Sequence, residues 1–312
     1  MLNRRLLRIK VLQALYTFVV GGVGDLAKGE AHLNKSINRL HELFTWNAAL
    51  LMGMKQIAEQ HIDISRNKHL PTEKDLNPNL RFVENPILVA LENDRELKTA
   101  INNYHVSWTN DQDITKKLFQ EFKKTSEYEA YMNKPTCSFT DHRNIMVFLF
   151  HEILEPSPMI EDYFEEMDIH WSEDIYFIQM LIGRALESFN ESNVSIMQPL
   201  FKDEDDHKFM INLFRKAVIN YDKNRELIAV KAANWEIDRI AVVDYMLMNL
   251  AIVEFIEFPS IPIKVTLNEY IEISKGFSSP KSKSFINGIL DKIVSEFVEQ
   301  KLIKKTGRGL VE

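Results

Sequence analysis

The sequence predicts an all-α protein. Glycine and proline are scarce, at 10 each in 312 residues, which disfavours folds that depend on many tight turns. Apolar residues recur at helical spacing through most of the chain, and no segment keeps the period of two that a half-buried strand needs. We therefore expect helices of ordinary or greater length, arranged in one large or two smaller domains.

The first helix is expected over residues 3–20. Leu7, Val11 and Phe18 lie on one buried stripe, and the glycines that follow residue 20 end the helix. Arg4 and Arg8 continue the same face. Because arginines are not buried without partners, we expect this cationic end of the helix to project beyond the core.

The middle of the chain is also expected to be helical, over residues 30–64, 87–104, 111–132, 141–154, 158–167 and 172–189. A polar stretch punctuated by prolines, residues 66–86, is typical of an exposed connection. Stripes such as Ile145, Phe148 and Leu149 need a buried partner. We therefore expect this region to be folded.

Helical patterns dominate the C-terminal part as well. A stripe begins at Phe209, a short helix is expected over 227–233, and a long apolar helix over 238–257. Thr266 and Glu269 have the spacing of a capping box, which predicts a helix start at that point.

The last helix is expected to start at Ser279-Pro280, an N-cap residue followed by proline. Gly288 lies inside this helix, where glycine costs about 1 kcal/mol relative to alanine. We expect close packing against a neighbouring helix to explain it.

The composition excludes several classes of protein. Cys137 is the only cysteine, so neither an intrachain disulfide nor a Cys-x-x-Cys zinc site is possible. The histidines lack metal-ligand spacing with carboxylates, and no P-loop or zincin motif is present. We therefore expect no enzyme activity, metal or cofactor. The absence of a long apolar run or a signal peptide predicts a cytoplasmic protein without a membrane span.

The formal charge of −7 argues against nucleic-acid binding, but the distribution of charge allows a local basic surface. Clustered guanidinium and ammonium groups bind phosphates, and aromatic rings beside lysines suit single-stranded RNA. A solvated helix terminus and two core phenylalanines are the alternatives. The candidate RNA-binding residues are Arg4, Arg5, Arg8, Lys10, Phe277, Lys281, Lys283 and Phe285.

Four segments together resemble the bacterial transcription antitermination factor NusB family. They are the arginine-rich first helix with its Gln-Ala-Leu-Tyr run (residues 4–16), and the blocks 234–240, 262–269 and 283–291. The resemblance implies an all-helical fold of packed bundles and no catalytic site. It also implies binding of boxA-type RNA together with the ribosomal protein NusE, in a complex with RNA polymerase that suppresses termination.

The resemblance divides the chain into a first helix (1–24), a helical insertion of unread function (25–200) and a C-terminal helical domain (201–312). By position it assigns the NusE contact to Tyr16, Asp206, Phe209 and Asn212. The sequence departs from the family pattern in the insertion, at Ser284 and at Asn249. Two alternatives stay open: a helical protein–protein adaptor without RNA binding, and an accessory domain of an RNA-modifying system.

Overall fold

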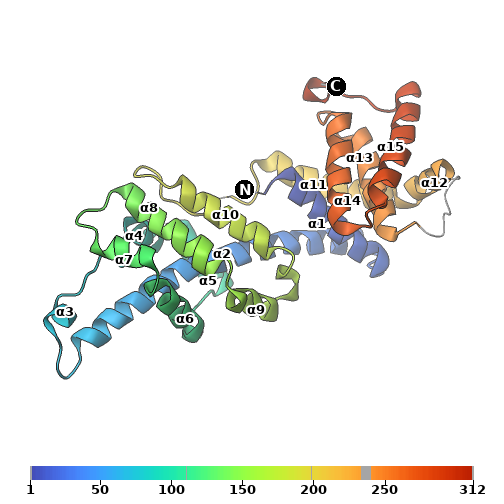
Figure 1. Ribbon diagram of the computed structural model, residues 1–312. Coiled ribbons are helices and arrows are strands. Elements are labelled where there is room, and N and C mark those ends of the chain that lie inside the picture. Colours follow the sequence, from blue (N-terminus) through green and yellow to red (C-terminus); the bar gives the residue numbers. More distant parts are fainter. Residues whose placement is uncertain (1, 110, 198, 233–239, 311–312) are drawn as a thin grey trace. The chain divides into compact units, whose positions relative to one another are not determined.

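The computed structural model describes residues 2–109, 111–197, 199–232 and 240–310, and it confirms the all-α prediction (Figure 1). Within these ranges the backbone forms helices joined by loops, with one isolated antiparallel bridge between Asn190 and Asn193 and no strand. None of the helices in these ranges is long and apolar enough to cross a membrane.

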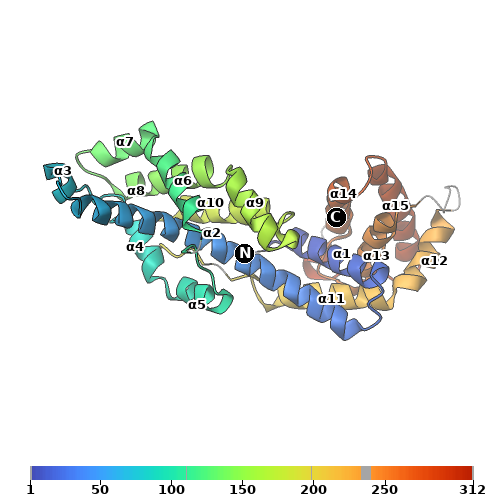
Figure 2. The same ribbon diagram turned by 90° about the horizontal axis from the view of Figure 1, so that it is seen from below.

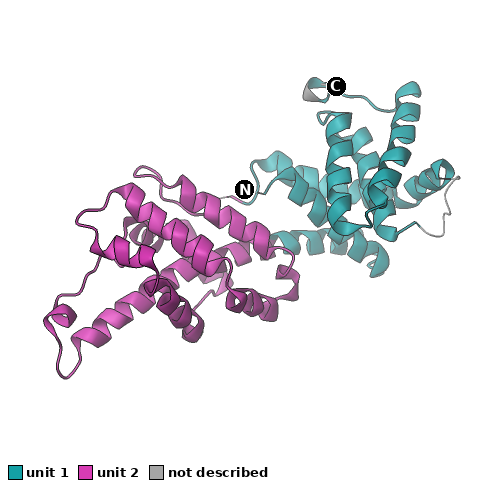
Figure 3. Ribbon diagram, viewed as in Figure 1, with its two compact units in different colours: residues 1–37, 200–312 teal, residues 38–199 magenta. Residues whose placement is uncertain are grey.

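The chain forms two compact units (Figure 3). Unit 1 comprises residues 1–37 and 200–312, and unit 2 comprises residues 38–199. The sequence of unit 1 holds 23 Lys and Arg against 19 Asp and Glu, whereas unit 2 holds 15 against 26. The acidity of the protein therefore belongs to unit 2, and unit 1 has a net positive charge.

Unit 1 is organised around α13, whose residues from Asp244 to Phe255 are all buried. Helices α1, α11, α12, α14 and α15 all pack against α13 (Figures 1 and 2). The helices of this unit are α1 (Arg4–Val20), the start of α2 (Leu26–Arg66), α11 (Glu204–Ile219), α12 (Tyr221–Lys231), α13 (Val242–Glu257), α14 (Ile263–Phe277), α15 (Ser282–Glu299) and the 3-10 turn η4 (Gly307–Leu310).

Helix α1 begins and ends where the sequence predicts. The side chain of Asn3 caps it by accepting a hydrogen bond from the Leu6 N–H at 2.9 Å. Gly22 follows the helix with a φ of 70°, a left-handed conformation that favours glycine. Leu7 and Val11 are fully buried, so the predicted stripe is the core face.

Two predicted helix starts near the C-terminus are wrong. Helix α14 begins at Ile263 with Pro262 as its N-cap, so Thr266 lies inside the first turn, where it is buried. Helix α15 begins at Ser282 with Lys281 as its N-cap, two residues after the predicted proline. Thr266 has the spacing of a capping box but does not cap the helix. Its hydroxyl instead donates a hydrogen bond to the buried carboxylate of Glu254.

The prediction of close packing at Gly288 is also wrong. A Cβ atom built there meets no atom within 4 Å, so α15 exposes this position to open space. Part of the family-like block 234–240 lies outside the described residues: Asn234 to Arg239 are not described.

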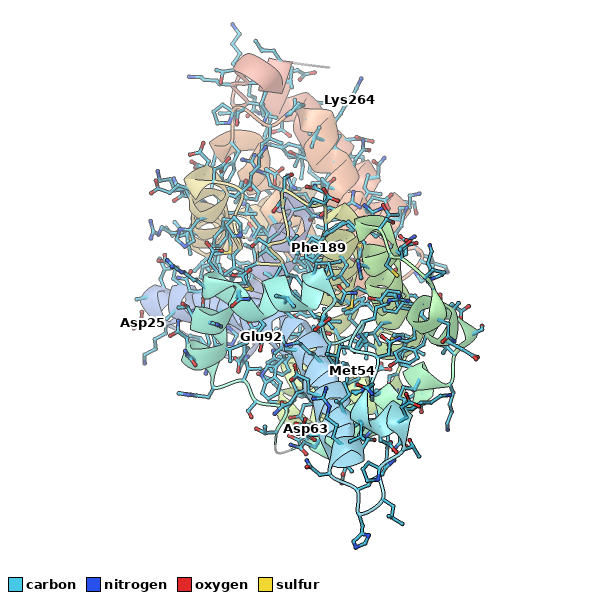
Figure 4. The ribbon with its side chains drawn as sticks, turned by 90° about the vertical axis from the view of Figure 1, so that its left-hand side faces the viewer. Asp25, Met54, Asp63, Glu92, Phe189 and Lys264 are labelled. Atoms are coloured by element: carbon cyan, nitrogen blue, oxygen red, sulfur yellow. The ribbon has the colours of Figure 1, made fainter. Side chains whose placement is uncertain are left out.

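Unit 2 is built on the long remainder of α2, which buries Met54 and exposes Asp63 further along (both labelled in Figure 4). Its other helices are α3 (Glu73–Leu76), α4 (Pro86–Asn93), α5 (Arg95–Tyr104), α6 (Gln112–Lys123), α7 (Ser126–Asn133), α8 (Phe139–Phe148), the π-helix η1 (Leu149–Leu154), α9 (Pro158–Met167), the 3-10 turn η2 (Ile169–Trp171) and α10 (Ile175–Ser188).

Two long helices predicted in unit 2 are each divided by a capping residue. Asp94 separates α4 from α5, because its carboxylate accepts hydrogen bonds from the N–H groups of Glu96 and Leu97. Thr125 separates α6 from α7 by accepting from the Tyr128 N–H. Such short polar side chains compete with the helical backbone for hydrogen bonds, which periodicity alone does not reveal.

Candidate nucleic-acid interface

Arg8 is the central residue of the arginine-rich helix, and it is buried. It is 2% exposed, and its Nε and Nη2 donate to the two carboxylate oxygens of Glu254 at 2.8 and 2.6 Å. Glu254 on α13 is 0% exposed and also accepts from the Thr266 hydroxyl at 2.8 Å and the Tyr270 hydroxyl at 3.1 Å. The carboxylate thus accepts four hydrogen bonds, two of them charge-assisted.

The electrostatics of this cluster keep Arg8 charged. Burial by itself lowers the pKa of Arg8, but the hydrogen bonds to Glu254 and the charge of that carboxylate outweigh it, so the pKa is raised above its usual value. Burial, and next the charge of Glu254, raises the pKa of Tyr270 well above its usual value, so its hydroxyl stays a donor.

The expectation of a bare cationic helix end is therefore wrong for Arg8. Arg8 is buried because α13 supplies a carboxylate inside the core, so this part of the helix does not project beyond it. Lys10, another candidate RNA-binding residue, is also buried, at 4% exposed. Removal of either member of this buried pair of Arg8 and Glu254 would leave an uncompensated charge in the core, so the two residues depend on each other.

Arg4 is half-buried and Arg5 is exposed, and each makes an ion pair with a carboxylate. Arg4 is 40% exposed and donates from Nε to Asp206 on α11 at 2.7 Å. Arg5 is 49% exposed and makes a bidentate pair with Glu269 on α14, with both distances 2.9 Å. The hydrogen bonds to Glu269 raise the pKa of Arg5. Exposed pairs of this kind contribute little stability, so a phosphate can compete for the guanidinium groups.

A carboxylate on α14, Glu272, interacts with cations of both α1 and α15. The pKa of Glu272 on α14 is lowered, first by the hydrogen bond from Lys275 and further by the positive charges of Arg5 and Lys283. These cations come from α1, α14 and α15 and act on one carboxylate. We call Arg5, Lys275, Lys281 and Lys283 the cationic face; the four side chains are exposed, and Lys281 is the N-cap of α15.

The two candidate stacking residues differ in exposure. Phe285 is 8% exposed and belongs to the core face of α15. Phe277, the last residue of α14, is only half-buried. Phe277 is therefore partly accessible to solvent, whereas Phe285 packs as the core alternative predicts.

The four candidate partner residues divide in the same way. Tyr16 and Asn212 are exposed. Asp206 is buried and paired with Arg4, and Phe209 is buried with its ring edge-on to Phe258 at a centroid distance of 4.9 Å. The guanidinium groups of Arg4 and Arg8 also lie over the Phe209 ring, at 5.1 and 5.3 Å. Phe209 is therefore a core residue in this structure.

A hollow of about 1140 Å³ opens beside this site within unit 1. Its lining combines both signs of charge with apolar surface: Leu2, Arg4, Arg5, Asp203, Asp206, Ile261, Val265 and Glu269 contribute to it. Such a mixed lining suits a protein segment better than a phosphate chain, because the acids repel phosphates.

The sequence reasoning missed the acidic partners of the arginines, above all Glu254. The signal was available, because a glutamate in the apolar run of α13 needs a cationic partner. Asn249 on the same helix is likewise satisfied: it accepts a hydrogen bond from Asn224 at 2.8 Å and donates one to the Ala217 carbonyl at 3.0 Å. Within the described ranges, no group of three or more His, Cys, Asp and Glu side chains is arranged to hold a metal ion.

Comparison with known proteins identifies relatives of part of this chain. Residues 175–295 match the model of the NusB family. A transcription antitermination protein NusB from Salinibacter ruber is 40% identical over 113 residues, which cover 36% of this chain and 71% of that protein. Proteins of the same name from Chloroherpeton thalassium and Koribacter versatilis are each 39% identical, over 104 and 94 residues.

These matches cover 33% and 30% of this chain, and 49% and 64% of the two relatives. The chain therefore spans between about half and 71% of the length of these three relatives. No solved structure matches the chain significantly. The matched range begins at α10 in unit 2 and ends within α15 in unit 1.

Proposed function

Because this chain belongs to the NusB family, we propose that it is a transcription antitermination factor that binds boxA-type single-stranded RNA together with the ribosomal protein NusE. The family is non-enzymatic, which agrees with the expectation of no catalytic site. The observation that carries the proposal is the 40% identity over 113 residues with a named antitermination protein. The proposal places the protein in the cytoplasm, where it would join RNA polymerase.

The cationic face is the part of unit 1 that we assign to RNA. Arg5 offers an exposed bidentate fork, and Lys281 and Lys283 add exposed ammonium groups at the start of α15. The half-buried ring of Phe277 offers a surface on which a base can stack. Arg4 completes the set, while Arg8, Lys10 and Phe285 support it from within the core.

The RNA test is a fluorescence-anisotropy titration at several salt concentrations. The probes are a boxA RNA and a scrambled RNA of equal composition, each with and without NusE. The double variant Arg5→Ala/Lys283→Ala should weaken boxA binding and flatten the plot of log K against log salt by about 0.7 per lost phosphate contact. Lys292→Ala, an exposed lysine further along the same helix, is the matched control and should leave the slope unchanged.

The rival function is a helical adaptor without RNA binding. It draws support from the carboxylates that already pair with Arg4, Arg5 and Arg8. Equal and weak affinity for both RNAs in the presence of NusE would leave the adaptor as the better description. A salt slope that the double variant does not change would remove the cationic face from the RNA site.

We assign the NusE contact to the exposed residues near α1 and α11. Asn212→Arg and Tyr16→Ala should each weaken capture by NusE, because each removes an exposed side chain from the proposed contact. Both variants should still fold, since neither side chain belongs to the core. Asp206→Lys is a harsher test, since it also breaks the pair with Arg4. Undiminished capture by both exposed-site variants would place the interface elsewhere.

Residues 38–174 of unit 2 lie outside the range that matches the family model. The excess of acidic residues in unit 2 makes it a poor RNA surface, so we assign it to stability or to contacts with proteins.

A further inference from the structure

The loop between α14 and α15 is closed by hydrogen bonds between serine side chains. It begins after Phe277, the last residue of α14, and ends at Ser282, the first residue of α15. The hydroxyl of Ser278 lies 2.9 Å from that of Ser282, and the hydroxyl of Ser279 also lies 2.9 Å from that of Ser282. The Ser282 N–H donates to the Ser279 carbonyl at 2.9 Å. The two ends of the loop are therefore held together.

A buried carboxylate joins this loop to α13. Asp244 lies in the first turn of α13 and is 4% exposed, and its Oδ1 accepts a hydrogen bond from the Ser278 hydroxyl at 2.5 Å. Ser282, on the other side of the loop, is 5% exposed. A carboxylate suits this position, because the N-terminal end of a helix favours negative charge. The loop is thereby anchored to the most buried helix of unit 1.

The anchored loop connects residues that we assign to RNA. Phe277 directly precedes Ser278, and two exposed lysines, Lys281 and Lys283, flank Ser282 on either side. The hydrogen bonds of the two serines therefore fix the backbone next to a half-buried ring and two ammonium groups in the free protein. A surface that is ordered before binding loses less conformational freedom when a ligand binds, which strengthens the binding.

We propose that Asp244 is a positioning residue of the RNA surface: it makes no contact with RNA but holds the α14–α15 loop in the conformation that binds it. This inference rests on the proposed function and adds the residue that fixes the geometry of the site. The charge of Asp244 makes the expected direction distinctive. A carboxylate near an RNA site repels phosphates, so its removal should strengthen binding if only charge matters. Its removal should weaken binding if the anchor matters.

The test is a fluorescence-anisotropy titration of the full-length protein with boxA RNA and scrambled RNA in the presence of NusE. Asp244→Ala removes the acceptor of the anchoring hydrogen bond, Ser278→Ala removes its donor, and Asp244→Asn keeps an acceptor oxygen without the charge. We expect each alanine variant to weaken boxA binding by about tenfold, because binding must then order the loop, and to leave the affinity for scrambled RNA undiminished. Asp244→Asn should retain most of the boxA affinity.

Hydrogen exchange of the free protein distinguishes positioning from direct contact. In both alanine variants the amides at the start of α15 should exchange faster, by a larger factor than those in the middle of α13. Ser295→Ala is the matched control, because Ser295 is exposed on α15 and its hydroxyl donates within the helix, to the Asp291 carbonyl at 2.9 Å. This control should change neither boxA affinity nor exchange at the start of α15. Weaker boxA binding without faster exchange would mean that Asp244 contacts the RNA directly and would overturn the positioning role.

The titration separates failure of this inference from failure of the proposed function. Wild-type preference for boxA, combined with undiminished boxA affinity in both alanine variants, would refute the role of Asp244 and leave the proposed function standing. A wild-type protein that binds boxA and scrambled RNA equally would refute the proposed function, and the RNA role of Asp244 with it. If Asp244→Ala does not fold, Ser278→Ala decides the question, because Ser278 is only half-buried and belongs to the same hydrogen bond.

Discussion

The buried pair of Arg8 and Glu254 offers the sharpest test of how unit 1 is held together. In Arg8→Met the guanidinium is lost, and Glu254 keeps only the hydroxyls of Thr266 and Tyr270 in a site that is 0% exposed. Removing one partner of a buried pair costs about 3–5 kcal/mol, because the remaining charge is uncompensated. We expect this loss in the free energy of unfolding.

The assay is hydrogen exchange of the α13 amides, followed by mass spectrometry, because α13 is the most buried helix of the unit. A loss of 3–5 kcal/mol corresponds to exchange faster by roughly two to three and a half orders of magnitude. The double variant Arg8→Met/Glu254→Met should recover most of the loss, since no charge stays buried. It should remain about 1–2 kcal/mol short because two hydroxyls lose their acceptor.

Arg5→Met is the matched control. Its pair with Glu269 is 49% exposed on the arginine side and 20% on the glutamate side, so its loss should cost at most about 1 kcal/mol. If Arg8→Met costs no more than Arg5→Met, the buried pair does not hold α1 in place and the reasoning is wrong.

Three other changes have directions that follow from local geometry. Gly288→Ala should raise the melting temperature, since the added Cβ meets open space inside a helix and alanine gains about 0.5–1 kcal/mol there. Gly183→Ala should lower the free energy of unfolding by about 1–3 kcal/mol, because the added Cβ would lie 2.4 Å from the His151 ring. Burial lowers the pKa of Lys305 to about 8, so between about pH 8 and 10.5 the unfolded chain binds a proton that the folded chain lacks. Stability should therefore rise with pH across that window, and Lys305→Met should abolish the rise in urea titrations. Limited proteolysis should cut first between residues 67 and 72, an exposed stretch without helix, and spare 141–190; early cuts within 141–190 would contradict the packing of unit 2.

Much of the fold was determined by local pattern. The stripe of Leu7, Val11 and Leu15 and the glycines after Val20 specify α1, because burial period and helix termination are encoded within a few turns. The same reasoning predicted α9 after Pro158. The family resemblance also came from the sequence alone, through short blocks in a fixed order, and the comparisons confirm it.

The tertiary structure decided which cations are exposed and which are buried. Arg4, Arg5 and Arg8 look equivalent in the sequence, yet Arg8 is buried against a carboxylate 246 positions away, whereas Arg5 is exposed. Likewise Thr266 has a capping pattern but serves the buried Glu254 instead. Local sequence cannot decide such cases, because the free energy of a buried charge depends on partners that only chain folding brings within hydrogen-bond distance.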